Sequence, residues 1–265
     1  VRPGTGRYTM FNAGVNAHPL LRYGLADASF ETGDARSSFY VNAQSFAFLN
    51  NKSDMLERTQ TANSLRELAT RRNSHYNDTY VAAGGDRTWS KADYSSFSLT
   101  FDYIPQSTKA KGQDMLTDIA SGVETPYDHF RKFDDKSYTG SANLYHKHTF
   151  DNKSALDMLL TFNLGKNTNR VDQTETAASG ASTLSYDYRN KRFGMSFAPA
   201  YKFSLAGLDT KVGLNTYYQD NSIRQAGTAS SAFKHREWDE YLYADVSRAW
   251  GGFSLAASVG VDAVF

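Results

Sequence analysis

Two histidines at alternate positions are the first residues whose types and spacing could do chemistry. His146 and His148 are spaced i, i+2, so on a strand both imidazoles project from one face, an arrangement that could bind zinc or haem iron. They continue a face that starts at Ala142 and Leu144, and they stand just before Phe150. Polar and aromatic rings of this kind populate membrane interfaces, so we interpret the pair as interfacial residues rather than ligands. The other histidines are scattered and show no ligand spacing: His18, His75, His129 and His235.

Acidic side chains gather in the polar stretch 104–137 and offer oxygen ligands of the kind that calcium takes. They are Asp114, Asp118, Glu124, Asp134 and Asp135. No position there follows the glycine and terminal glutamate pattern of a helix–loop–helix calcium site. We therefore expect a solvated loop rather than a metal site.

Gly84-Gly85 is the one glycine pair that invites a phosphate-binding interpretation. It lacks the Lys-Ser/Thr that completes a phosphate loop, and no helix is predicted after it. Glycine inside a strand pattern instead predicts a bulge or strong curvature. No Ser-His-Asp arrangement with local support appears either. The sequence thus predicts no catalytic, cofactor-binding or metal-binding residue and no cofactor, and we do not expect an enzyme.

The composition excludes several classes of protein. The chain has 265 residues, no cysteine, 29 Lys+Arg against 28 Asp+Glu, and a net charge of +1. Without cysteine there is no disulfide scaffold, thiolate metal site or cysteine nucleophile. A charge near zero argues against nucleic acid as a partner, because nucleic-acid binders carry a basic excess. No stretch approaches the roughly 20 apolar residues of a membrane-spanning helix.

Period-two alternation runs along most of the chain and predicts an all-β protein. In 253–265, Phe253, Leu255 and Val259 share one face, whereas Ser254 and Ser258 take the other. Alternation over 13 residues indicates a strand with one apolar and one wet side. A strand that crosses hydrocarbon at a tilt needs about 9–11 residues, so the pattern favours an antiparallel transmembrane β-barrel.

The connections alternate between tight turns and long polar stretches. Tight turns are predicted near 33–36, 90–93, 151–153, 205–207 and 249–252. Between them lie polar stretches that we expect to be long loops, at about 51–74, 104–137, 166–182 and 219–236. The stretch 55–72 has helix-like leucine and arginine spacing and reads either as a short helix or as a polar strand extension. The connection near Pro19-Leu20 is short where a long loop is due.

Aromatic residues cluster beside the tight turns and predict a belt at one membrane surface. They are Phe30, Trp89, Phe150, Phe203, Trp250 and Phe253. Short turns on one side and long loops on the other are typical of outer-membrane barrels.

Eleven strands are predicted, within one segment that spans 1–265. Their ranges are about 8–18, 22–32, 36–50, 75–89, 94–104, 138–150, 154–165, 183–204, 208–219, 237–249 and 253–265. Single-chain bacterial barrels have an even number of strands, so we expect a part of a larger barrel. The chain starts at Val1 without a signal peptide, which favours a mature protein or a piece of something longer.

Two runs carry a family resemblance. They are LSYDYRNKRFGMSFAPAYKFSLAGLDTKVGLNTYYQDNSIRQ and WDEYLYADVSRAWGGFSLAASVGVD, and the earlier HYNDTYVAAGGDRTWSKADYSSFSLTFDY is similar in kind. Together they resemble the barrel portion of TonB-dependent outer-membrane receptors of the Bacteroidetes type, a Gram-negative group. The resemblance covers most of 75–265 and rests on strand and turn pattern with a few aromatic and glycine positions.

The resemblance implies a 22-stranded barrel in the outer membrane, occluded by a plug and energised by TonB. It implies membrane lipid, TonB, the barrel assembly machinery and, in some relatives, a surface lipoprotein as partners. The chain shows no plug sequence and about half of the strands, so the implied TonB-dependent uptake belongs to a full-length protein. The cargo is left open among glycans, peptides, siderophores and haem.

Two other functions fit the same pattern. The chain could be a smaller, self-contained outer-membrane barrel that acts as a porin, an adhesin or a loop-based binding protein. It could also be a secreted soluble β-protein such as a carbohydrate-binding sandwich, which would bury Phe193, Phe197, Leu255 and Val259 in a dry core. Extraction without detergent separates the soluble alternative from the membrane ones.

Overall fold

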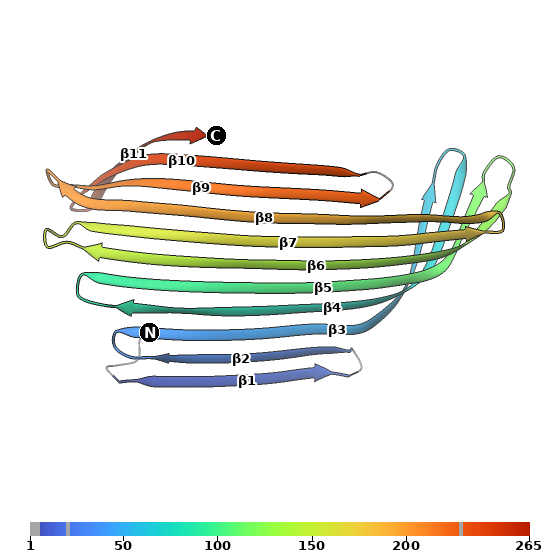
Figure 1. Cartoon of the computed structure of the whole chain (residues 1–265), viewed down its shortest axis with the longest axis horizontal. Coiled ribbons are helices and arrows are strands. Elements are labelled where there is room, and N and C mark those ends of the chain that lie inside the picture. Colours follow the sequence, from blue (N-terminus) through green and yellow to red (C-terminus); the bar gives the residue numbers. More distant parts are fainter. Residues whose placement is uncertain (1–5, 20–21, 228–229) are drawn as a thin grey trace.

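A computed structural model describes residues 6–19, 22–227 and 230–265. These residues form one antiparallel sheet of eleven strands that pair in chain order, from β1 at one edge to β11 at the other (Figure 1). The strands are β1 (Tyr8–His18), β2 (Tyr23–Gly33), β3 (Ser37–Gln60), β4 (Ser64–Thr88), β5 (Asp93–Asp118), β6 (Glu124–Thr149), β7 (Ala155–Ala177), β8 (Gly180–Leu205), β9 (Leu208–Gly227), β10 (Ser231–Trp250) and β11 (Phe253–Val264). The prediction of eleven antiparallel strands is confirmed. Among the described residues no helix is long and apolar enough to span a membrane.

The tight turns all lie at one end of the sheet, which we call the short-turn end and which is at the left of Figure 1. They comprise residues 34–36, 89–92, 150–154, 206–207 and 251–252. Strand boundaries at this end lie within about two residues of the predicted ones, because the alternation there contrasts apolar with polar side chains.

The prediction of long polar loops at the opposite end of the sheet, which we call the far end, is wrong. Most of 51–74, 104–137 and 166–182 continues the strands, and the connections shrink to 61–63, 119–123 and 178–179. The stretch 55–72 is strand, not helix. The fourth predicted loop, 219–236, is also mainly strand, although 228–229 lie outside the described residues, as does Leu20 of the short connection predicted near Pro19. Polar residues on both faces hide a period-two pattern, so alternation could not reveal these extensions.

The two faces of the sheet differ in chemistry, as the alternation predicts. Residues opposite one another on antiparallel strands share a face, and Phe97, Leu144, Leu160 and Phe197 form one continuous row across β5 to β8. One position further along, the row on the other side of the sheet is Ser98, Asn143, Thr161 and Ser196. We call these the apolar face and the polar face.

The sheet is a single layer without a hydrophobic core. Among the described residues the buried apolar side chains are four alanines and Val171. The residues that a sandwich would bury are exposed instead: Phe193 36%, Phe197 39%, Leu255 59% and Val259 69%. The described sheet is therefore not a two-layer sandwich, and its apolar face is uncovered.

The sheet is open, and it bends at the far end. β1 and β11 each pair with one neighbour among the described strands. The pairing of β3 with β4 shifts register between Phe48 and Asn51, where Asn50 has a φ of 56°. Such a β-bulge bends a strand, and beyond it the far ends of the β3–β4 and β5–β6 hairpins bend sharply across the direction of the other strands (Figure 1).

Candidate functional site

The polar face carries a ladder of hydrogen-bonded side chains. Thr100 and Ser141 hydroxyls are 2.7 Å apart, Asn143 Nδ2 donates to Ser98 Oγ at 3.2 Å, and Thr161 Oγ1 donates to Asn143 Oδ1 at 3.0 Å. These residues belong to β5, β6 and β7, and their hydroxyl and amide groups satisfy one another across the polar face.

A polar hollow of about 470 Å³ lies beside this ladder. Its floor includes Gly165 and Gly194, where the missing side chains leave space, and Arg192 and Tyr217 stand at its border. Tyr217 Oη donates to Gln219 Oε1 at 2.9 Å, which fixes two polar groups at its rim. A cationic group, a phenol and several amides in one hollow suit a ligand rich in hydroxyl or carbonyl oxygens.

Nearer the short-turn end, Asp157 on β7 is 9% exposed and fully partnered. Tyr145 Oη donates to its Oδ1 at 2.7 Å, and Lys202 Nζ lies 2.5 Å from its Oδ2. The three residues tie β6, β7 and β8 together on the polar face.

The most buried charged group lies at the far end of the polar face. Asp114 on β5, His129 on β6 and Glu175 on β7 place their ligand atoms within 4.8 Å of one another. Asp114 is 1% exposed and His129 is 6% exposed. The expectation that Asp114 lies in a solvated loop is wrong, because the far-end strands fold over it.

Arg66 on β4 holds this cluster together, and we call the four residues the far-end network. Its Nε donates to Asp114 Oδ2 at 2.6 Å, and its Nη2 donates to Glu175 Oε1 at 2.5 Å. The hydrogen bond to Asp114 raises the pKa of Arg66. Burial by itself would raise the pKa of Glu175, but the hydrogen bond and charge of Arg66 outweigh it and hold that pKa below its ordinary value.

Two carboxylates and an imidazole are a ligand set that zinc and similar cations accept. Asp114 Oδ1, His129 Nδ1 and the nearby Thr70 Oγ1 have no hydrogen-bond partner among the described residues. The guanidinium of Arg66 nevertheless already neutralises part of the carboxylate charge, and a divalent cation would have to sit beside it. The arrangement is therefore an ion-pair network in which Arg66 bridges Asp114 and Glu175.

The histidine pair does not converge on a common ligand. His146 Nδ1 lies 2.8 Å from Ser95 Oγ, and His148 Nδ1 lies 2.6 Å from Asp93 Oδ1. Each imidazole thus has its own partner on β5, on the apolar face near the short-turn end.

The other sequence candidates are also separated. Asp118 accepts hydrogen bonds from the Ser121 amide at 2.8 Å and from its hydroxyl at 2.7 Å, which closes the turn 119–123. Glu124 starts β6. Asp134 lies 2.6 Å from Lys132, whereas Asp135 points to the opposite face.

No bulge occurs at Gly84-Gly85, contrary to one of the two expectations for it. The register continues through both residues, and a Cβ on Gly84 would lie 2.6 Å from the Tyr40 hydroxyl. On Gly85 a Cβ would lie 2.5 Å from the Ser38 carbonyl oxygen. Close approach of neighbouring groups therefore explains the pair.

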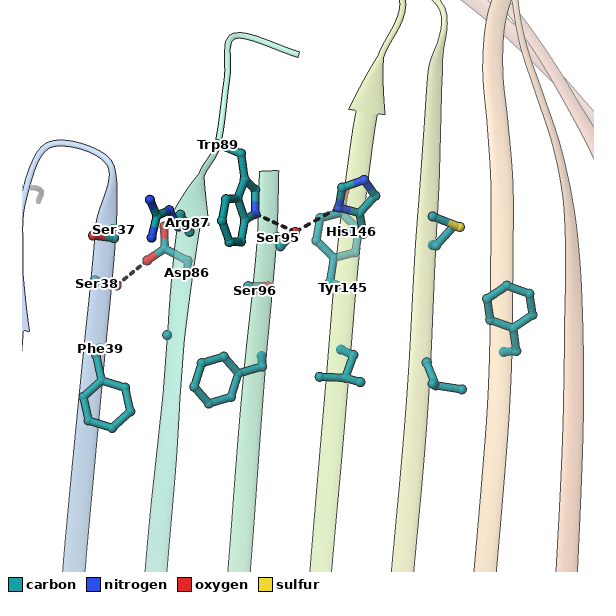
Figure 2. A pocket seen from close by; sticks show the side chains of 16 residues that line it. Ser37, Ser38, Phe39, Asp86, Arg87, Trp89, Ser95, Ser96, Tyr145 and His146 are labelled. Atoms are coloured by element: carbon teal, nitrogen blue, oxygen red, sulfur yellow. Dashed lines mark hydrogen bonds between the residues drawn. The ribbon is translucent and has the colours of Figure 1, made fainter. Parts of the chain in front are cut away.

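A second hollow, of about 630 Å³, lies over Gly85 and opens on the apolar face (Figure 2). Phe39 and Phe97 flank it with ring centroids 6.4 Å apart. Toward the short-turn end, Trp89 Nε1 donates to Ser95 Oγ at 3.1 Å (Figure 2). The hollow is therefore apolar along the strands and polar at its turn side.

Sequence reasoning missed the far-end network because its members are far apart along the chain. His129 was set aside as lacking ligand spacing, but it lies opposite Glu175 in the register of β6 and β7. Turn chemistry at Thr61, which accepts a hydrogen bond from the Ser64 amide at 3.0 Å, was the one local signal that β3 and β4 form a hairpin there.

No protein-family model matches the chain, and no curated protein matches it. The resemblance to TonB-dependent receptors therefore stays a prediction from the residues quoted above.

Proposed function

We propose that this chain forms part of the wall of an outer-membrane transport barrel, in which the apolar face contacts lipid and the polar face lines the lumen. The observation that carries the proposal is the uncovered apolar face of a single-layer sheet. Leu255 and Val259, for example, are 59% and 69% exposed. Apolar surface on this scale marks a contact with lipid or with another protein.

The backbone supports lipid as that contact. In the half of the sheet nearer the short turns, every strand from β2 to β10 pairs on both sides, which satisfies backbone amides and carbonyls there without water. The edges β1 and β11 present unpaired backbone groups along their length, which in a membrane must be closed by further strands. We propose that other strands of a larger barrel complete the wall.

Strand length gives the wall an orientation. β4, β5, β6 and β8 have 25 or 26 residues, whereas a tilted strand crosses hydrocarbon with about 9–11. Since outer-membrane barrels place short turns in the periplasm, the far end projects outward. The aromatic residues at the short-turn end, such as the stacked Trp250 and Phe253, then lie at the periplasmic interface.

The polar face suits an oxygen-rich cargo. The hollow bordered by Arg192 and Tyr217 offers cationic, phenolic and amide groups to hydroxyls and carboxylates. In line with the family resemblance, we propose TonB-dependent uptake of such a nutrient by the full-length protein, together with the partners that this family implies. Glycans, peptides and siderophores all fit this chemistry.

The test uses the full-length gene product in a Gram-negative host. We expect it in the outer-membrane fraction, extractable only with detergent, and we expect Arg192→Ala to reduce uptake of cargo. Arg36→Ala, which removes the same charge at the short-turn end, should leave uptake unchanged. Uptake that persists without TonB would favour the porin alternative, and a product soluble without detergent would overturn the proposal.

A further inference from the structure

The apolar face changes character abruptly toward the far end. Leu164 on β7 and Phe193 on β8 lie opposite each other, and two residues further along the same face Lys166 lies opposite Lys191. In that same row Tyr138 on β6 lies opposite Lys166. A lipid-facing surface thus ends in a phenol and two ammonium groups.

Basic residues gather beyond this border in a hollow of about 700 Å³. Its charged lining consists of six cations and two carboxylates, a net charge of +4 on one surface of a chain whose total is +1. We call the six cations the basic border: Lys132, Lys136, Lys166, Arg170, Arg189 and Lys191.

The carboxylates in and beside this hollow are already engaged. Asp134 lies 2.6 Å from Lys132, Asp187 lies 2.8 Å from Arg189, and Asp172 lies 3.0 Å from Arg170. Among the described residues no carboxylate forms an ion pair with Lys136, Lys166 or Lys191. The Lys166 ammonium lies 5.9 Å from the centroid of the Tyr138 ring.

Like charges face each other here on neighbouring strands. Lys166 is opposite Lys191, and Arg189 is opposite Arg224. Directly opposed like charges destabilise a sheet, so the arrangement needs an anion between them to become favourable. Phosphate groups fit best, since lysine and arginine bind them through charge-assisted hydrogen bonds.

We propose that the basic border binds the phosphate groups of a phosphorylated lipid in the outer leaflet, whose acyl chains lie along the apolar face from Leu164 and Phe193 toward the short-turn end. This inference rests on the proposed function, because it takes the apolar face as the lipid-facing one. Continuity of the basic border with that face selects a lipid over a free anion, which would need no adjoining apolar surface.

The test measures lipid binding by the purified full-length protein in uncharged detergent micelles, with native mass spectrometry as the readout. The probes are a diphosphorylated glycolipid (lipid A), its monophosphorylated form and phosphatidylcholine. We expect affinity to fall in that order and to weaken with added salt. The double variant Lys166→Gln/Lys191→Gln should bind diphosphorylated lipid about ten- to thirtyfold more weakly, as expected for the loss of two lysines at an anionic headgroup.

A matched control removes two lysines at the opposite end. Lys91→Gln/Lys153→Gln changes the short turns 89–92 and 150–154 and should bind lipid as the parent chain does. Folding gives a second readout, because relief of the Lys166–Lys191 repulsion should raise the thermal unfolding temperature in lipid-free micelles. A lower temperature there would overturn the account of the like-charge pair.

Two outcomes separate this inference from the proposed function. The proposal of a lipid site is wrong if the chain enters membranes but binds the three lipids equally, or if millimolar pyrophosphate displaces the lipid completely. Either result leaves the proposed barrel wall unaffected. If the chain stays soluble without detergent and binds no lipid, both fall together.

Discussion

The guanidinium of Arg66 on β4 donates a hydrogen bond to the carboxylate of Glu175 on β7 at 2.5 Å, although two strands lie between them. In a flat sheet these strands would be about 14 Å apart, given a spacing of about 4.8 Å per strand. The far end must therefore coil strongly around the polar face. This coiling buries Asp114 and orders the polar extensions of the strands at the far end.

Loss of Arg66 should loosen this coil. In Arg66→Gln, Asp114 keeps a buried carboxylate without its cation, which should cost about 1–3 kcal/mol of local stability. Hydrogen exchange should accelerate at the far ends of β4, β5 and β7. The control Arg58→Gln breaks the ion pair with Glu67 on the exposed surface and should change exchange little, since such pairs contribute about 0–1 kcal/mol. Equal effects of the two variants would contradict the role of the far-end network.

Acid should release the same contact. The pKa of Glu175 is held below its ordinary value, so its pairing stabilises the folded state above the unfolded pKa and is lost as pH falls through the folded one. We expect hydrogen-exchange protection at the far end to be constant from neutral pH to about 5 and to decline below about 4. An unperturbed glutamate titrates near this pH, and the lowered pKa of Glu175 moves the decline further down. Glu175→Gln should flatten this decline. A decline centred near pH 6 would point to a different group.

Gly112 on β5 should tolerate no side chain. A Cβ there would overlap the carbonyl oxygen of Ala69 on β4 and lie 2.7 Å from Thr70 Cα. Gly112→Ala should therefore destabilise the far end by about 1–3 kcal/mol, as overpacking does. Gly24→Ala on β2 has open space around its new methyl group and should be nearly neutral. Denaturant unfolding of both variants checks this, and a neutral Gly112→Ala would show that the two strands are further apart than described.

Adjacent leucines on β7 provide the sharpest test of the two faces. Leu160 lies on the apolar face in the row with Leu144 and Phe197, whereas Leu159 lies on the polar face and is 39% exposed. If the apolar face contacts lipid, Leu160→Arg should destabilise the membrane-inserted protein by about 2–4 kcal/mol, and Leu159→Arg much less. Unfolding from lipid vesicles measures both. The reverse order would show that the polar face is the outer one.

Several features could be predicted from the sequence alone. Period-two alternation between residues such as Phe253 and Ser254 located all eleven strands and their short-turn ends, because a strand with one apolar and one wet side must alternate.

Only the tertiary structure shows which residues meet at the far end. There, polar residues occupy both faces, so alternation carries no information, and strand pairing alone determines which residues meet. Arg66 is 48 positions from Asp114 and 109 from Glu175, and only the register of four strands brings them together. The same holds for Lys166 and Lys191, whose direct opposition follows from the β7–β8 pairing. The chemistry of each residue is local, but its partners are set by hydrogen bonds between backbones that are distant along the chain.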